Sequence, residues 1–365
     1  MNKSIMFVGL DVHKEKINVA VADTEGEREV RSYGPVNGTS VAVEKMLRKY
    51  ISIGKIPKVV YEAGPTGFAL QRSLTQKNID CVVVAPSLIP KKSGDRVKTD
   101  RRDAVSLARL HRAGELSPIY VPQEKDEAMR DLTRARVDAN IAYRRARQLL
   151  LSLLLRNGIY YTGKSNWTPA HLNWISRINL PHQAQQIVFQ EYLHAIEETR
   201  LRHERLVDQI RMLSQTWSRY PLVQALQALR GVSLIVASGV VSELGDIKRF
   251  DSPRQLYSFL GLVPSEYSSG INRRQGSITK CGNTHARWLL TEAAWAYQKG
   301  PKMSPIIRRR QQNLPQHICE IAWRAQIRCT KKYRHMVNKG KNPKLAITAV
   351  ARELTGFMWE IARAI

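Results

Sequence analysis

The chain has 365 residues, 43% of them hydrophobic, which is enough to form two or three globular domains. Lys and Arg total 58 against 31 Asp and Glu, so the formal net charge is +27. Because this excess is spread along the chain, it favours binding to a polyanion such as nucleic acid. The alternative is a soluble protein whose surface is basic but binds no polyanion.

The cysteines and the apolar runs exclude several other classes of protein. None of the four cysteines forms a C-x-x-C pair, so neither a zinc site nor a redox motif is indicated, and we expect reduced thiols. The N-terminus lacks the apolar segment of a signal peptide. No run of about 18 apolar residues occurs, so we expect no membrane span and a cytoplasmic location.

The first part of the chain predicts an α/β sheet with helices packed on it. Residues 5–11 and 16–22 read as two strands joined by a tight turn, and residues 28–35 as a third, antiparallel strand. Helices and strands then alternate, with helices over 40–50 and 68–77 and strands over 58–62 and 80–85. Such alternation is typical of α/β folds.

A helix is predicted over residues 100–113, after a polar and basic loop. Asp100 and Asp103 are three positions apart at its start, so both carboxylates lie on one face, where the positive end of the helix dipole favours them.

The second part of the chain predicts helices. Two long helical segments, 123–157 and 190–218, are expected to pair as an antiparallel hairpin or coiled coil. After Pro221 the pattern changes to short helices separated by glycine turns and polar loops. We therefore predict three domains. Residues 1–122 form a metal-binding α/β domain, residues 123–220 a helical linker and oligomerisation region, and residues 221–365 a helical C-terminal domain.

Four acids stand at the ends of predicted elements: Asp11 and Glu62 close strands, and Asp100 and Asp103 open a helix. In open α/β sheets, sites gather at the carboxyl ends of strands. Converging carboxylates repel one another unless a divalent cation neutralises them, and Mg²⁺ prefers such oxygen ligands. Each acid also has a purely structural interpretation, with Asp11 in a turn, Glu62 at a strand end and Asp100 as a helix N-cap.

Three motifs, VGLDVHKEKINVAV, YEAGPTG and KTDRRDAVSLARL, carry these acids in that order. Together they resemble the DEDD transposases and recombinases of the IS-one-ten insertion-sequence family, and residues 229–290 resemble the family's C-terminal region. The resemblance implies an RNase H/RuvC-like domain that binds Mg²⁺, with Mn²⁺ as an alternative. The ligands it implies are Asp11, Glu62, Asp100 and Asp103.

The resemblance also implies a serine nucleophile in the Ser-Ser-Gly segment at 268–270. Ser269, which precedes the glycine, is the expected nucleophile, and Ser268 is the alternative. Attack on phosphorus would give a phosphoserine link that keeps the bond energy for rejoining. The nearby cations expected to bind nucleic acid and to stabilise the transition state are Arg273, Arg274 and Lys280.

The function that the resemblance implies is a transposase that excises and inserts the DNA of a mobile element. Its partners would be the donor and target DNA, a noncoding guide RNA encoded by the element, and further copies of the chain in a dimer or tetramer, in the bacterial cytoplasm at the nucleoid. The acids and the serine are far apart in sequence, so one active site requires the C-terminal domain to fold back or a second subunit to lend its serine.

Two alternatives remain open at this stage. A metal-dependent nuclease or Holliday-junction resolvase would use the same acids with water as the nucleophile. A catalytically silent nucleic-acid-binding protein would use neither the acids nor the serine.

Overall fold

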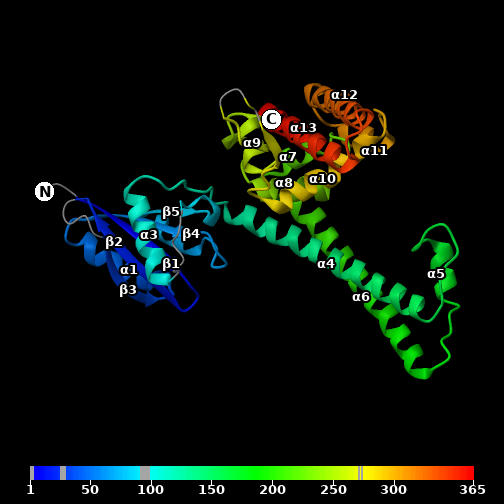
Figure 1. Cartoon of the computed structure of the whole chain (residues 1–365), viewed down its shortest axis with the longest axis horizontal. Coiled ribbons are helices and arrows are strands. Elements are labelled where there is room, and N and C mark those ends of the chain that lie inside the picture. The colour runs from blue at the N-terminus through cyan, green and yellow to red at the C-terminus, as the bar shows by residue number, and fades with distance from the viewer. Residues whose placement is uncertain (1–3, 25–29, 91–98, 270–271, 273) are drawn as a thin grey trace. The chain divides into compact units, whose positions relative to one another are not determined.

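The structure, a computed structural model, describes residues 4–24, 30–90, 99–269, 272 and 274–365. The chain separates into two compact units, Met1–Pro122 and Gln123–Ile365 (Figure 1). The further division of the second unit at residue 220 stays a prediction.

A mixed β-sheet forms the centre of the first unit. Its strands are β1 (Ile5–Val12), β2 (Lys16–Asp23), β3 (Arg31–Asn37), β4 (Ile56–Glu62) and β5 (Asp80–Val84), in the order β3-β2-β1-β4-β5. The first three strands are antiparallel neighbours, whereas β1, β4 and β5 run parallel. This mixed sheet with helices on it confirms the expected α/β class and is consistent with an RNase H-like domain.

Helices cover both faces of this sheet: α1 (Ser40–Ile51), α2 (Ala69–Gln76) and α3 (Asp100–Arg112). Alternate residues of β1, including Val8 and Leu10, pack in a core with α1 and α2. On the opposite face, Ala20 and Ala22 of β2 pack against alanines of α3. The small side chains on this face bring the backbone of α3 close to the sheet.

The second unit is mostly helical and begins with a long antiparallel hairpin. Helices α4 (Glu124–Arg156) and α6 (Gln183–Thr216) lie along each other (Figure 1), with α5 (Pro169–Ile175) in the connection between them. Leu150, Leu154 and Phe189 form a small core with α5 at that end. The predicted pairing is confirmed, although α6 begins seven residues earlier than expected, at Gln183 rather than 190.

The remaining helices share one large apolar core, to which all but α11 contribute buried side chains. They are α7 (Tyr220–Leu226), α8 (Leu234–Leu244), α9 (Pro253–Phe259), α10 (Thr284–Ala294), α11 (Pro305–Gln311), α12 (Gln316–Asn338) and α13 (Pro343–Ala364). Helix α8 is buried along most of its length because helices pack around it.

The sequence predicted only helices, glycine turns and polar loops after Pro221, but two short strands form after residue 260. These strands, β6 (Pro264–Glu266) and β7 (Gln275–Ile278), pair as an antiparallel hairpin. Their side chains are mostly exposed, so no apolar alternation marks them in the sequence.

Among the described residues, no helix is both long enough and apolar enough to cross a membrane.

Candidate active site

The sheet places Asp11 and Glu62 on neighbouring strands. Leu10 of β1 is in register with Tyr61 of parallel β4, and Asp11 and Glu62 are the next residue on each strand. On the other side of β1, Asp11 pairs with Asn18 of β2. Because side chains alternate along a strand, all three point to the face that α3 covers.

Helix α3 brings two more acids to this face. Thr99 caps the helix, because its hydroxyl accepts a hydrogen bond from the backbone N–H of Arg102 at 3.3 Å. The structural interpretation of Asp100 as the N-cap is therefore wrong. Asp100 and Asp103 lie instead in the first turn of the helix, where the backbone N–H groups favour negative charge.

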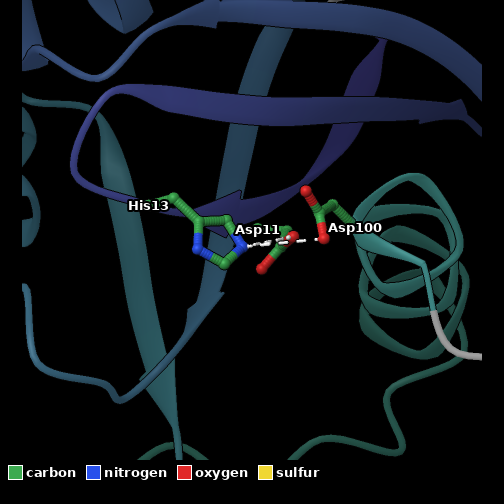
Figure 2. Close-up of side chains that lie close together, drawn as sticks. All are labelled: Asp11, His13 and Asp100. Atoms are coloured by element: carbon green, nitrogen blue, oxygen red, sulfur yellow. Dashed lines mark hydrogen bonds and ion pairs between the residues drawn. The ribbon is translucent and has the colours of Figure 1, made fainter.

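Asp11, His13 and Asp100 form a cluster whose possible ligand atoms all lie within 4.8 Å of one another (Figure 2). The Nε2 atom of His13 is 3.1 Å from Oδ2 of Asp11 and 3.9 Å from Oδ1 of Asp100. Among the described residues, neither Glu62 nor Asp103 belongs to a group this tight. The fold thus joins two of the four expected acids closely and adds a histidine.

Two side chains of β2 also contact Asp100. The ammonium of Lys16 lies 3.0 Å from Oδ2 of Asp100, and Nδ2 of Asn18 donates to the same oxygen at 3.5 Å. Neither residue was expected at the site. The antiparallel pairing of β2 with β1 was the signal that could have found Asn18, since it sets Asn18 opposite Asp11.

The two carboxyl groups differ in their electrostatics. Burial raises the pKa of Asp11, His13 opposes this, and the charges of Asp100 and Asp103 add to it. In contrast, the hydrogen bond from Lys16 lowers the pKa of the more exposed Asp100. Asp11 therefore carries a negative charge that its surroundings do not fully offset.

The residues of this cluster fit a divalent cation. Carboxylate oxygens of Asp11 and Asp100 are hard donors from two different elements, and the imidazole of His13 offers a nitrogen donor beside them. A cation there would offset both the burial and the smaller repulsion from Asp100 and Asp103 that raise the pKa of Asp11.

The expected serine residues lie at the end of the β6–β7 hairpin, which we call the serine hairpin and define as residues 264–278. The Ser268 hydroxyl donates to Oε1 of Glu266 at 2.9 Å and accepts from the backbone N–H of Arg274 at 3.2 Å. Ser269 exchanges two backbone hydrogen bonds of 3.2 Å with Asn272. Ser269 is exposed, and no hydrogen bond joins its hydroxyl to another of the residues that the structure describes.

The expected cations lie on or near this hairpin. Arg274 and Lys280 are both exposed. Lys280 has a positive φ of 57°, and its backbone N–H donates to the carbonyl of Gly261 at 3.2 Å, which fixes the chain where the hairpin ends. Arg273 lies outside the described residues.

An α/β unit with acids at the carboxyl ends of its strands, followed by a helical unit, is consistent with a DEDD-type transposase. Residues 8–157 match the family model of the DEDD transposases of the IS110 group. Residues 223–306 match the model described as "Transposase IS116/IS110/IS902 family". The two matches lie in different halves of the chain, as the motifs predicted.

Two relatives extend this similarity over nearly the whole chain. "Putative transposase y4qE" of Sinorhizobium fredii is 44% identical over 357 residues, which is 98% of this chain and 88% of the relative. "Transposase for insertion sequence element IS1533" of Leptospira borgpetersenii is 29% identical over 345 residues, 93% of this chain and 99% of the relative. The chain belongs to the IS116/IS110/IS902 family of transposases, so it is the transposase of an insertion sequence, an enzyme that acts on DNA.

Proposed function

We propose that this transposase cuts and rejoins DNA strands with the acids of an RNase H/RuvC-like domain and the hydroxyl of Ser269. The observation that carries this proposal is the approach of Asp11 and Asp100, which come from β1 and α3 and lie 89 positions apart in sequence. Because mutual repulsion of two carboxylates is costly, such a pair is typical of sites that bind a cation.

The proposed metal ligands are Asp11, Glu62, Asp100 and Asp103. A bound Mg²⁺ or Mn²⁺ ion would polarise the phosphodiester and offset the negative charge that develops on it. Glu62 follows the strand residue paired with Leu10, so a side-chain rotation would bring its exposed carboxylate toward Asp11. Lys16 and His13 are placed to bind phosphate oxygens at the same edge of the sheet.

In the proposed reaction, Oγ of Ser269 attacks phosphorus and forms an O–P bond. The bond from phosphorus to the departing deoxyribose oxygen breaks, the serine proton passes to water, and the departing oxygen takes up a proton. The phosphoserine link keeps the energy of the phosphodiester, so a strand hydroxyl can attack it and restore free serine.

The contacts of the two serines support Ser269 as the nucleophile. Ser268 is tied within the serine hairpin by Glu266 and by the backbone of Arg274. Ser269 has an exposed hydroxyl that can approach a phosphate without breaking a hydrogen bond to another described residue. We therefore assign Ser268 to holding the hairpin and Ser269 to the chemistry.

The proposed nucleic-acid contacts are Arg273, Arg274 and Lys280, beside the nucleophile. A net charge of +27 supports binding to more nucleic acid than one short DNA site, which accords with a noncoding guide RNA that reads sequence by base pairing. We further propose that α4 and α6, within residues 123–220, join copies of the chain as a dimer or tetramer. The protein would act at the bacterial nucleoid.

A covalent-adduct assay tests this proposal. The wild type and its Ser268→Ala, Ser269→Ala and Asp11→Ala variants are incubated with the element's flanking DNA, its RNA and Mg²⁺, and are then separated on a denaturing gel. The proposal expects a protein–DNA adduct that Ser269→Ala and Asp11→Ala abolish and Ser268→Ala reduces only in part. Cleavage that requires Asp11 but survives both serine changes without an adduct would indicate a water-dependent nuclease.

A further inference from the structure

A buried carboxylate links the long helix α4 to the base of the serine hairpin. Glu243, on α8, has a fully buried side chain. Its Oε1 accepts from Nε of Arg134 at 2.6 Å, and its Oε2 accepts from Nη2 of Arg134 at 2.9 Å. Because Arg134 belongs to α4, this bidentate ion pair joins α4 to the core of the second unit.

The same carboxylate holds the residue that starts helix α10. Nδ2 of Asn283 donates to Oε2 of Glu243 at 2.6 Å. The other end of this side chain, Oδ1, accepts from the backbone N–H of Ala286 at 2.9 Å and so caps α10. Asn283 is therefore fixed at both ends of its amide, and it follows β7 by five residues.

The chain between β7 and Asn283 is packed closely against the end of α9. The backbone N–H of Thr279 donates to the carbonyl of Val263 at 2.9 Å. A side chain at Gly282 would place its Cβ 1.9 Å from the carbonyl oxygen of Phe259, so the two segments touch backbone to backbone. Nη1 of Arg287 on α10 donates to the carbonyl of Leu260 at 2.8 Å. The orientation of Asn283 is thus passed on to both strands of the hairpin.

We propose that Arg134, Glu243 and Asn283 form a clamp that sets the position of the serine hairpin, with Glu243 as its positioning residue. We call these three residues the Glu243 clamp. The inference rests on the proposed role of Ser269, and it makes helix α4 part of the machinery that presents this serine. A displacement of α4 would pull on Glu243 and, through Asn283, on the hairpin.

The chemistry of the clamp explains why it needs all three members. Burial alone would raise the pKa of Glu243, but the hydrogen bonds from Arg134 and Asn283 hold the pKa below its usual value, so the carboxylate stays ionised. A buried ionised carboxylate is stable only while its partners remain in place. The clamp is consequently rigid, because releasing either partner leaves a buried charge unmatched.

Two variants separate this clamp from ordinary helix capping and packing. Glu243→Gln keeps the size of the side chain but removes its charge. Asn283→Ser retains an N-cap for α10, since serine caps helices as well as asparagine does, but it removes the donor to Glu243. The matched control is Glu353→Gln, which breaks the 2.5 Å ion pair between Arg328 on α12 and Glu353 on α13 without touching the hairpin.

Hydrogen–deuterium exchange of the full-length protein measures how firmly the hairpin is held, independently of the reaction with DNA. In both clamp variants, the amides of residues 262–282 should exchange about tenfold faster, while those of α12 and α13 keep their rates. Adduct formation should also slow about tenfold, because a positioning residue sets the alignment of the reacting groups. The control variant should change neither quantity.

Two results would overturn the clamp. One is unchanged exchange at residues 262–282 in both variants, and the other is faster exchange spread evenly over the second unit, which would mean a loss of general stability. If the wild type forms no adduct, the proposed role of Ser269 fails on its own, while the exchange measurement still decides whether the clamp holds the hairpin.

Discussion

Gly9 of β1 lies against the backbone of Ala104 in α3. A Cβ atom at Gly9 would be 2.3 Å from the carbonyl oxygen of Ala104 and 2.4 Å from the backbone nitrogen of Ala108. Any other residue would push the helix off the sheet, and backbone cannot move aside as a flexible side chain can. This close approach is what lets Asp100 at the start of α3 meet Asp11, two residues beyond Gly9.

The Gly9→Ala variant should therefore lose stability and site geometry together. We expect the first unit to lose about 2 kcal/mol of unfolding free energy, the ordinary effect of overpacking a core. DNA cleavage should fall as Asp100 moves away from Asp11. Hydrogen exchange of α3 and of β1 measures the first effect. Gly64→Ala is the control, because apart from its chain neighbours the nearest described atom to its added methyl group would be the carbonyl oxygen of Glu62 at 3.9 Å, and it should leave that exchange unchanged.

The Asp11→Asn variant should separate catalysis from folding. Because burial raises the pKa of this carboxyl, the ionised form destabilises the folded state at neutral pH. The amide should fold at least as well, and its advantage should disappear as the pH falls through the raised pKa. Mg²⁺-dependent cleavage should drop about a thousandfold.

Thermal unfolding over a series of pH values and a Mg²⁺-dependent cleavage assay measure these effects. Asp23→Asn is the control on the same sheet, because Asp23 pairs with Lys55 at 2.6 Å at the far end of β2. Equal cleavage by Asp11→Asn and the wild type would refute the proposed metal site.

The stability of the first unit should fall at mildly acidic pH because of His111. The imidazole ring packs edge-on against the ring of Phe7, with 5.3 Å between the ring centroids. Burial lowers the pKa of this imidazole. The unfolded chain therefore binds a proton more readily, so stability is lost as the pH falls through about 6.5 toward the lowered pKa. In His111→Phe, this part of the pH dependence should vanish. Hydrogen exchange of α3 between pH 8 and pH 5 would show it, and an identical decline in both proteins would disprove it.

Removing single cations near the serine hairpin should change the salt dependence of DNA binding. For each of Arg274→Gln and Lys280→Gln, the slope of log affinity against log salt should decrease by about 0.9, because one phosphate contact is lost. Lys55→Gln, whose ammonium pairs with Asp23, should leave the slope unchanged. Titrations over a series of salt concentrations measure the slopes, and unaltered slopes in both hairpin variants would place the DNA elsewhere.

The sequence by itself predicted most of the secondary structure and the family. The apolar alternation of β1 and β2 and the helical spacing of α3 and α4 are local patterns, and local patterns follow from backbone geometry and burial. The positions of Asp11 and Glu62 at strand ends are also local. The motifs around these acids predicted the family, which the matches over residues 8–157 and 223–306 confirm.

Only the tertiary structure showed which side chains meet. It placed Lys16 and Asn18 on Asp100 and pressed Gly9 against α3. It also joined Arg134 to Glu243 across 109 positions and paired β6 with β7 although neither strand has apolar alternation. The pattern of a segment encodes what that segment buries, but it does not encode which distant segment lies opposite. That choice depends on the packing of the whole unit. The cluster of Asp11, His13 and Asp100 and the Glu243 clamp could therefore be recognised only in the tertiary structure.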